Sequence, residues 1–260
     1  MKVVAIVQAR MGSTRFPGKV LMPILKKPVL WHVVQRTRRA KLIDEPVVAT
    51  STNTKDKKIV NFCKKNNIRV FSGSENDVLG RYYQCAKKYK ANVIVRITAD
   101  CPLIDPELID KAIKLLLKGN YDHVGLATGA GVAKSKVKKF PDGMDCSVFT
   151  FKSLATAYLE ANDDDEREHV NMFIWKRPRI FKLANLESNV DYSNLRLTVD
   201  YKEDLALVRK IYQKFYLSNH HFGLFDIISF IKANPKLLDI NSRHIGKEGY
   251  LELWQSKKEN

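Results

Sequence analysis

The amino-terminal residues that could do chemistry lie close together, between positions 8 and 19. Their cations and hydroxyls are Arg10, Ser13, Thr14, Arg15 and Lys19. This stretch directly follows residues 3–7, whose continuous apolar run is typical of a parallel strand that is covered on both faces. In open α/β sheets, ligands bind just past the carboxyl ends of such strands. The sequence therefore predicts that this loop holds a polyphosphate, because a loop without a ligand rarely needs three cations beside a buried strand. A solvated basic loop is the alternative.

The loop differs from a Walker P-loop in its spacing and in one residue. Five residues rather than four separate Gly12 from Gly18, and Val20 stands where a metal-binding Ser or Thr would follow the lysine. We therefore expect the three cations to supply charge, while the two hydroxyls and the backbone amides around Gly12 and Gly18 supply short-range donors.

Composition and charge narrow the class of protein. The chain has 260 residues, with 45 Lys and Arg against 28 Asp and Glu, which gives a formal net charge of +17. This charge suits nucleic acid, anionic lipid or an anionic small substrate. The lysines occur in short, dispersed runs without interleaved aromatics, as is typical of a solvated surface. We expect an anionic small-molecule partner and no nucleic acid, and keep a basic binding module for nucleic acid or anionic surfaces as the lesser alternative.

Cysteine usage and hydropathy indicate a cytoplasmic protein. The four cysteines are scattered without a Cys-x-x-Cys pair, so neither a zinc knuckle nor a disulfide framework is indicated. The amino terminus runs into a strand without a signal-peptide pattern, and no apolar stretch approaches the roughly 18 residues of a membrane span. We therefore expect cytoplasmic localisation without membrane insertion.

Strand-like and helix-like segments alternate through the first half of the chain. The expected strands are residues 3–7, 46–51, 69–71, 93–97, 123–126, 147–151, 179–183 and 195–199. The expected helices are residues 29–39, 56–65, 77–88, 106–118, 154–161 and 203–216. This alternation predicts right-handed crossovers and a Rossmann-like, mostly parallel sheet in an α/β fold, with helices on both faces. An irregular connection at 127–141 interrupts the pattern.

Polar side chains follow four of the expected strands in succession. These side chains lie at residues 10–19, 50–52, 72–77 and 98–100. Because the carboxyl ends of parallel strands share one edge of a sheet, all of them should converge there. The convergence predicts one site at that edge.

Two aspartates in similar contexts are candidate metal ligands. Asp100 and Asp200 each end an apolar strand-like run, as Ile-Thr-Ala-Asp and Leu-Thr-Val-Asp. Mg²⁺ is usually held by one or two carboxylates and completes its shell with water and phosphate oxygens. Helix capping is the alternative, and it is serious for Asp200, which fits an N-cap with an acidic third position. It is weaker for Asp100, because Asp105 and Pro106 already supply a cap and a first-position proline.

Six motifs together resemble a known family. They lie at residues 8–19, 73–82 (GSENDVLGRY), 98–104 (TADCPLI), 141–145 (PDGMD), 166–170 (EREHV) and 198–205 (TVDYKEDL). The chain resembles the cytidylyltransferases of the spore-coat polysaccharide biosynthesis protein F type, relatives of CMP-Kdo and CMP-sialate synthetases, over residues 1 to about 215. The resemblance implies a sheet of the nucleotide-diphosphosugar transferase, GT-A-like type with a small inserted lobe. It also implies CTP as donor, Mg²⁺ as cofactor, and synthesis of an activated precursor for surface polysaccharide.

The resemblance also implies roles for individual residues. We expect a cytidylyltransferase domain at 1–220 and a helical tail at 221–260, and the irregular region at about 127–180 is the expected dimerisation or acceptor lobe. Catalytic roles fall to Arg10, Arg15, Lys19 and Asp100. Nucleotide binding falls to Ala9, Arg10, Gly12, Ser13, Thr14, Arg15, Lys19, Ser51 and Arg81, and metal binding to Asp100 and Asp200. A homodimer would place its contact in the lobe.

Three residues are candidates for binding the acceptor. A cationic fork and an imidazole suit a carboxylate or a phosphate, which makes Arg167 and His169 candidates. A satisfied, partly buried histidine is an equal alternative for His169. A role for Asp145 rests on the resemblance alone. CMP-Kdo synthetases usually have Pro at the position of Gln8 and Gln-Gly-Asp-Glu-Pro at 98–102, so their sugar-acid acceptor is not carried over.

The sequence thus predicts a CTP-dependent nucleotidyltransferase that moves CMP to an anionic acceptor, either a sugar acid or a phosphate monoester, and releases pyrophosphate. A GT-A-fold glycosyltransferase that uses a nucleotide sugar is the alternative. That class should show an Asp-x-Asp metal motif after a central strand, whereas residues 99–102 here read Ala-Asp-Cys-Pro.

Overall fold

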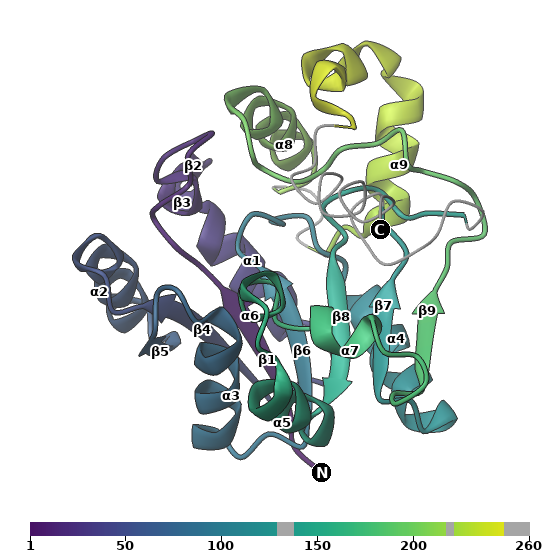
Figure 1. The fold of residues 1–260 in the computed structure, drawn as a ribbon. Helices are drawn as coiled ribbons and strands as arrows, with labels where there is room; N and C mark the ends of the chain where they lie inside the picture. The colour runs from purple at the N-terminus through teal and green to yellow at the C-terminus, as the bar shows by residue number, and fades with distance from the viewer. Residues whose placement is uncertain (129–137, 217–220, 247–260) are drawn as a thin grey trace.

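A seven-stranded sheet forms the centre of the molecule (Figure 1). The computed structural model describes residues 1–128, 138–216 and 221–246. The strands of this sheet are β1 (Val3–Gln8), β4 (Glu45–Ser51), β5 (Arg69–Gly73), β6 (Val93–Thr98), β7 (His123–Leu126), β8 (Cys146–Thr150) and β9 (Leu183–Leu186). Their spatial order is β5-β4-β1-β6-β8-β7-β9. Only β8 runs antiparallel to its neighbours within these described ranges, so the sheet is mostly parallel, as predicted.

Helices cover both faces of the sheet. The helices are α1 (Val29–Arg38), α2 (Lys57–Lys65), α3 (Val78–Lys88), α4 (Pro106–Gly119), α5 (Phe151–Glu160), α6 (Asp164–Glu168), α7 (Met172–Trp175), α8 (Lys202–Phe215) and α9 (Leu224–Ala233). Buried residues of α1, α2, α4, α8 and α9 form one core. Buried residues of α3, α5 and α7 form the second core on the opposite face, and these helices lie in front of the sheet in Figure 1. Two covered faces explain why the central strands are apolar throughout.

Short elements connect the sheet to the helices. The loop after β1 leads into the 3-10 helix η1 (Lys19–Leu21) and the hairpin of β2 (Pro23–Ile24) with β3 (Lys27–Pro28). The 3-10 helix η2 (Thr54–Asp56) precedes α2, and η3 (Pro235–Ile240) and η4 (Ser242–His244) follow α9. Asp105 caps α4 as predicted, because its Oδ1 accepts from the backbone N–H groups of Glu107 and Leu108.

The α/β class and the alternation of elements are confirmed, but two expected strands were wrong. Residues 179–182 form a turn and its exit, and the strand follows at β9. Residues 195–199 are joined to the turn at 141–144 by one isolated bridge, Asp142 to Arg196, and form no strand. The segment is apolar and buried, and its backbone bonds to the turn at 141–144 and to Asp100. Burial alone does not produce a ladder of hydrogen bonds.

The domain division stays a prediction. Residues 129–137 of the expected lobe and residues 247–260 of the expected tail lie outside the described residues, as does the boundary at residue 220. None of the helices in the described ranges has the length and apolarity that crossing a membrane requires.

Candidate active site

Lys19 lies between Asp100 and Asp200, the two aspartates that the sequence predicts as metal ligands. The loop that carries it closes when the backbone N–H of Gly18 donates to the carbonyl of Met11, and Gly18 then adopts a left-handed conformation with φ +73°. The Lys19 side chain is buried, and its Nζ donates to Asp100 Oδ2 at 2.6 Å and to Asp200 Oδ1 at 2.7 Å. Residues separated by up to 181 positions therefore share one ammonium group.

This contact keeps both charges in place despite burial. Burial alone would lower the pKa of Lys19, but Asp100 and Asp200 raise it above the usual lysine value. Burial alone would likewise raise the pKa of Asp100, but the Lys19 ammonium lowers it to about 2. The ammonium and the Asp100 carboxylate are therefore both charged at neutral pH.

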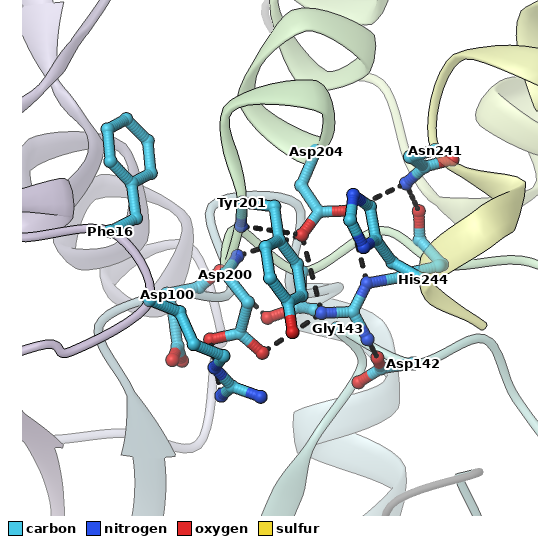
Figure 2. Close-up of polar contacts among 12 residues, drawn as sticks. Phe16, Asp100, Asp142, Gly143, Asp200, Tyr201, Asp204, Asn241 and His244 are labelled. Atoms are coloured by element: carbon cyan, nitrogen blue, oxygen red, sulfur yellow. Dashed lines mark hydrogen bonds and ion pairs between the residues drawn. The ribbon is translucent and has the colours of Figure 1, made fainter. Parts of the chain in front are cut away.

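Arg196 contacts Oδ2 of Asp200, whereas Lys19 contacts Oδ1. Figure 2 shows Asp142, Asp200, Asp204 and Asn241, which take part in the same polar network. The Arg196 guanidinium contacts three carboxylates, at 2.7 Å to Asp142, 3.0 Å to Asp200 and 3.1 Å to Asp204. Burial would lower the pKa of Arg196, but these carboxylates raise it. Asn241 completes the network by donating to the backbone carbonyl of Arg196 and to Asp204. Asp200 is therefore a preorganised carboxylate rather than a mobile surface group.

A close backbone approach fixes the turn that carries Asp142. Gly143 has φ +98°, and a Cβ at this position would lie 2.5 Å from backbone atoms of Leu197 and Thr198. Two hydrogen bonds join the same segments, from Asp142 N to Leu195 O and from Leu197 N to Asp142 O. Only glycine fits here, which brings Asp142 against Arg196.

The capping alternative for Asp200 is wrong for its side chain. Asp204 accepts the backbone N–H groups of Asp200 and Tyr201 at the start of α8. The Asp200 carboxylate instead contacts Lys19, Arg196 and Arg15, the last at 3.0 Å. The Asp200 carboxylate is therefore not used as a helix cap and can bind a ligand at the site.

A cavity of about 190 Å³ opens beside these residues. It is lined by Gln8, Arg10, Ser13, Thr14, Arg15, Lys19, Val20, Thr98, Ala99, Asp100 and Asp200. Seven of the residues predicted from the sequence line this one cavity. Three cations and two carboxylates in one hollow can bind a polyphosphate together with a hard divalent cation.

Ser51 and Arg81 lie outside the lining of this cavity, as do Ala9 and Gly12. Asp56, which the sequence reasoning missed, links two loops at the sheet edge. It accepts from the backbone N–H of Met11 after β1 and from the N–H and hydroxyl of Ser51 at the end of β4. Arg81 donates to the carbonyl of Ser74, and burial lowers its pKa.

The three candidates for binding the acceptor, Asp145, Arg167 and His169, do not line the cavity. Arg167 forms a two-pronged ion pair with Asp77, with nitrogen to oxygen distances of 3.1 and 2.7 Å. Asp145 accepts from the Thr128 hydroxyl and from the backbone N–H of Gly143, and burial raises its pKa. Burial lowers the pKa of His169. Their acceptor roles stay predictions.

A family model described as Cytidylyltransferase matches residues 4–223. The chain belongs to the cytidylyltransferase family. The spore coat polysaccharide biosynthesis protein SpsF of Bacillus subtilis is 33% identical over 219 residues, which are 82% of this chain and 87% of that protein. A cytidylyltransferase structure from Leptospira borgpetersenii is 33% identical, with a TM-score of 0.82 over 92% of this chain and 97% of that chain. The expected family is confirmed, and the chain is a CTP-dependent nucleotidyltransferase.

A more distant structural neighbour shares the fold of this cytidylyltransferase. It is a CMP:2-keto-3-deoxy-manno-octonic acid synthetase solved with CTP, 16% identical, with a TM-score of 0.61 over 82% of this chain and 99% of that chain. At this identity the likeness supports the expected GT-A-like sheet, which is confirmed.

The sequence reasoning did not identify two arginines of this cytidylyltransferase as functional candidates, although each stands in an unusual sequence context. Arg196 comes four residues before Asp200 within an apolar run, and Arg96 interrupts the buried run of β6. A charge inside such a run needs a partner. For Arg196 the structure supplies three aspartates, none of which the sequence spacing identifies as its partner.

Proposed function

We propose that this cytidylyltransferase moves CMP from CTP to an anionic acceptor, a sugar acid or a phosphate monoester, and releases pyrophosphate. One observation carries the proposal: Arg10, Arg15 and Lys19 line the same cavity as Asp100 and Asp200. The family supports cytidylyl transfer, and the net charge of +17 suits anionic substrates.

Catalysis rests on position and charge. An acceptor oxygen attacks the α-phosphorus of CTP in line, and the bond to the pyrophosphate oxygen breaks, so no protein nucleophile is needed. Arg10 and Arg15 are exposed at the mouth of the cavity, where they can bind phosphate oxygens. Lys19 exchanges its carboxylate partners for phosphate oxygens and stabilises the charge that moves onto pyrophosphate. Loss of one such cation typically costs a few kcal/mol of transition-state stabilisation.

Asp100 and Asp200 are the residues that would hold Mg²⁺. They fit the ion, because an oxygen of each carboxylate already contacts the same cationic group, the Lys19 ammonium. Mg²⁺ binds through one or two carboxylates and takes its other ligands from water and phosphate. When bound, it would neutralise phosphate charge during the transfer. The described residues include no group of three or more potential ligands, so substrate oxygens would have to complete the shell.

The broader assignment is part of the same proposal. We place the enzyme in the cytoplasm, in the synthesis of an activated precursor for surface polysaccharide, and as a homodimer through residues 127–180. The similarity to a spore coat polysaccharide biosynthesis protein supports the pathway.

A pyrophosphate-release screen tests the function. Each nucleoside triphosphate is combined with a panel of sugar acids and phosphate monoesters, with and without Mg²⁺. We expect release only with CTP, an anionic acceptor and Mg²⁺ together. Consumption of a nucleotide sugar without any use of free CTP would contradict the proposal and favour the glycosyltransferase alternative.

A further inference from the structure

Arg96 is a largely buried cation without an anionic partner. It lies inside β6, and among residues 1–128, 138–216 and 221–246 no carboxylate forms an ion pair with it. Its Nε is buried and has no hydrogen-bond partner in the described structure. Removing a charged donor from water without a partner is costly, and protein structures seldom retain such a group without a reason. This orphaned donor indicates a missing anion.

The groups that surround Arg96 are neutral. Ser147 is its register partner on β8, and the Asn171 amide donates to Ser147 Oγ at 3.1 Å and to the ring of His123 at 2.9 Å. Burial, followed by the charge of Arg96, lowers the pKa of His123 to about 4. Burial raises the pKa of the Tyr82 phenol to about 12, although the charge of Arg96 and a hydrogen bond with it act in the opposite direction. None of these groups neutralises the guanidinium.

The nearest acid along this face of β8 is already engaged. Asp145 stands two residues before Ser147 and accepts from the Thr128 hydroxyl at 2.6 Å and from the Gly143 N–H at 2.8 Å. Burial raises the pKa of Asp145, and both of its carboxyl oxygens already accept hydrogen bonds. It leaves the charge of Arg96 unmatched.

A strained loop brings two further residues to Arg96. Val170, between α6 and α7, has φ +52°, a conformation that is costly for a β-branched residue. Its neighbours are His169 and Asn171, and the His169 ring lies close enough to Arg96 for that charge to affect its pKa. Strain of this kind persists only where the surroundings enforce it, and it gathers at ligand sites.

The position of Arg96 connects it to the nucleotide cavity. Side chains two residues apart on a strand share a face, so Arg96 and the cavity-lining Thr98 point to the same side of β6. Two residues of strand span roughly 7 Å. In Figure 1, α6 and α7 lie over this part of the sheet, in front of β6 and β8. Arg96 lies outside the lining of the cavity but roughly 7 Å along the strand from Thr98, a distance that a small acceptor can span.

We propose that Arg96 binds the carboxylate or phosphate of the acceptor, with the loop at residues 169–171 as the second side of the same subsite. This proposal rests on the proposed function and names where the anionic group of the acceptor lies. It differs from the assignment of that role to Arg167, whose charge Asp77 already matches.

Two measurements on the full-length enzyme test this subsite. Crystals of the wild type and of Arg96→Met are soaked with selenate, and anomalous diffraction locates the anion. Steady-state pyrophosphate release then gives KM for CTP and for two acceptors, the sugar acid 3-deoxy-manno-octulosonate and the phosphate monoester glycerol 3-phosphate. Arg179→Met is the matched control, because Arg179 is exposed in the turn after α7 and its loss changes the net charge equally.

We expect selenate at Arg96 in the wild type and not in Arg96→Met. The acceptor arm that supports turnover should show KM raised at least tenfold in Arg96→Met, with KM for CTP within twofold. Arg96→Lys should recover part of the loss, because it keeps the charge and loses the fork. Equal thermal unfolding midpoints would show that the variants are folded.

Failure of the Arg96 subsite and failure of the proposed function give different results. Absence of selenate from Arg96 in the wild type, or an acceptor KM that Arg96→Met leaves unchanged, overturns the subsite. An equal rise of KM for CTP and acceptor also overturns it. Selenate bound at Arg96 in an enzyme that releases no pyrophosphate from CTP with any acceptor of the full panel supports the anion site and overturns the proposed function instead.

Discussion

Replacement of Lys19 by methionine removes the cation that Asp100 and Asp200 share and keeps most of the side-chain volume. Nζ lies 2.6 and 2.7 Å from the two carboxylates, and Lys19 is 8% exposed. Removal of one partner from a buried ion pair typically costs about 3 to 5 kcal/mol. Asp200 keeps Arg15 and Arg196, and the Asp100 side chain is 25% exposed, so we expect about 2 to 3 kcal/mol.

The pH dependence of this loss has a definite sign. The folded-state pKa of Asp100 is about 2, below its ordinary 3.8, so the stabilisation through this carboxylate is present above about pH 4. It is lost as the pH falls through about 2. The pKa of Lys19 is raised above 10.5, so its contribution is lost only as the pH rises beyond that value. The difference between wild type and Lys19→Met should therefore be constant from about pH 5 to 9 and shrink toward pH 2.

Urea unfolding at pH 3 and pH 7 measures the stability difference, and pyrophosphate release measures turnover. We expect turnover to fall about a hundredfold or more, because Lys19 also meets the charge that develops on pyrophosphate. Lys26→Met is the control, since Lys26 is exposed near the same loop. Equal stability of wild type and Lys19→Met at pH 7, or a turnover near normal, would refute the reasoning.

Three further changes test other parts of the site. Asp100→Asn should lower turnover about a hundredfold or more in a folded enzyme and weaken Mn²⁺ binding, measured by electron paramagnetic resonance; unchanged Mn²⁺ binding would remove Asp100 from the metal site. Arg196→Met should lower the free energy of unfolding by about 3 to 5 kcal/mol, because it leaves buried carboxylates without their cation, and wild-type stability in urea would contradict this. Asp56→Ala should raise KM for CTP several-fold with less effect on kcat, because the backbone N–H groups of Met11 and Ser51 lose the acceptor that joins their two loops; an unchanged KM would show that the loop needs no such support.

The sheet could be predicted because its strands are identified by residues that are close together in the sequence. The apolar runs of β1, β4 and β6 and the turns between them follow from composition and spacing. The segment at 195–199 was assigned wrongly because an apolar run reports burial and not its partner. Its backbone pairs with the turn at 141–144 and with the carbonyl of Asp100, and this arrangement depends on contacts between distant parts of the chain.

The gathering of the candidate residues around one cavity was predictable for a different reason. Parallel strands bring their carboxyl ends to one edge, so the loop at 8–19 and Asp100 had to meet there. Asp200 comes from a crossing segment, and only its similar context suggested a partner for Asp100. Asp56 gave no signal, because an aspartate before a helix is ordinarily a cap. Its links to two loops require the folded chain.

The balance of charge at the site supports the proposed divalent ion between Asp100 and Asp200, although Lys19 lies between these carboxylates in the structure. Asp100, Asp142, Asp200 and Asp204 face three cations: Lys19, Arg196 and the more exposed Arg15. In the free enzyme this cluster is close to neutral, which lets buried carboxylates remain charged. When a triphosphate draws Lys19 and Arg15 toward its own oxygens, Asp100 and Asp200 lose the positive charges that neutralise them. The triphosphate adds further negative charge at the same time. A divalent cation between Asp100 and Asp200 would restore the balance, so nucleotide and metal should bind with positive cooperativity.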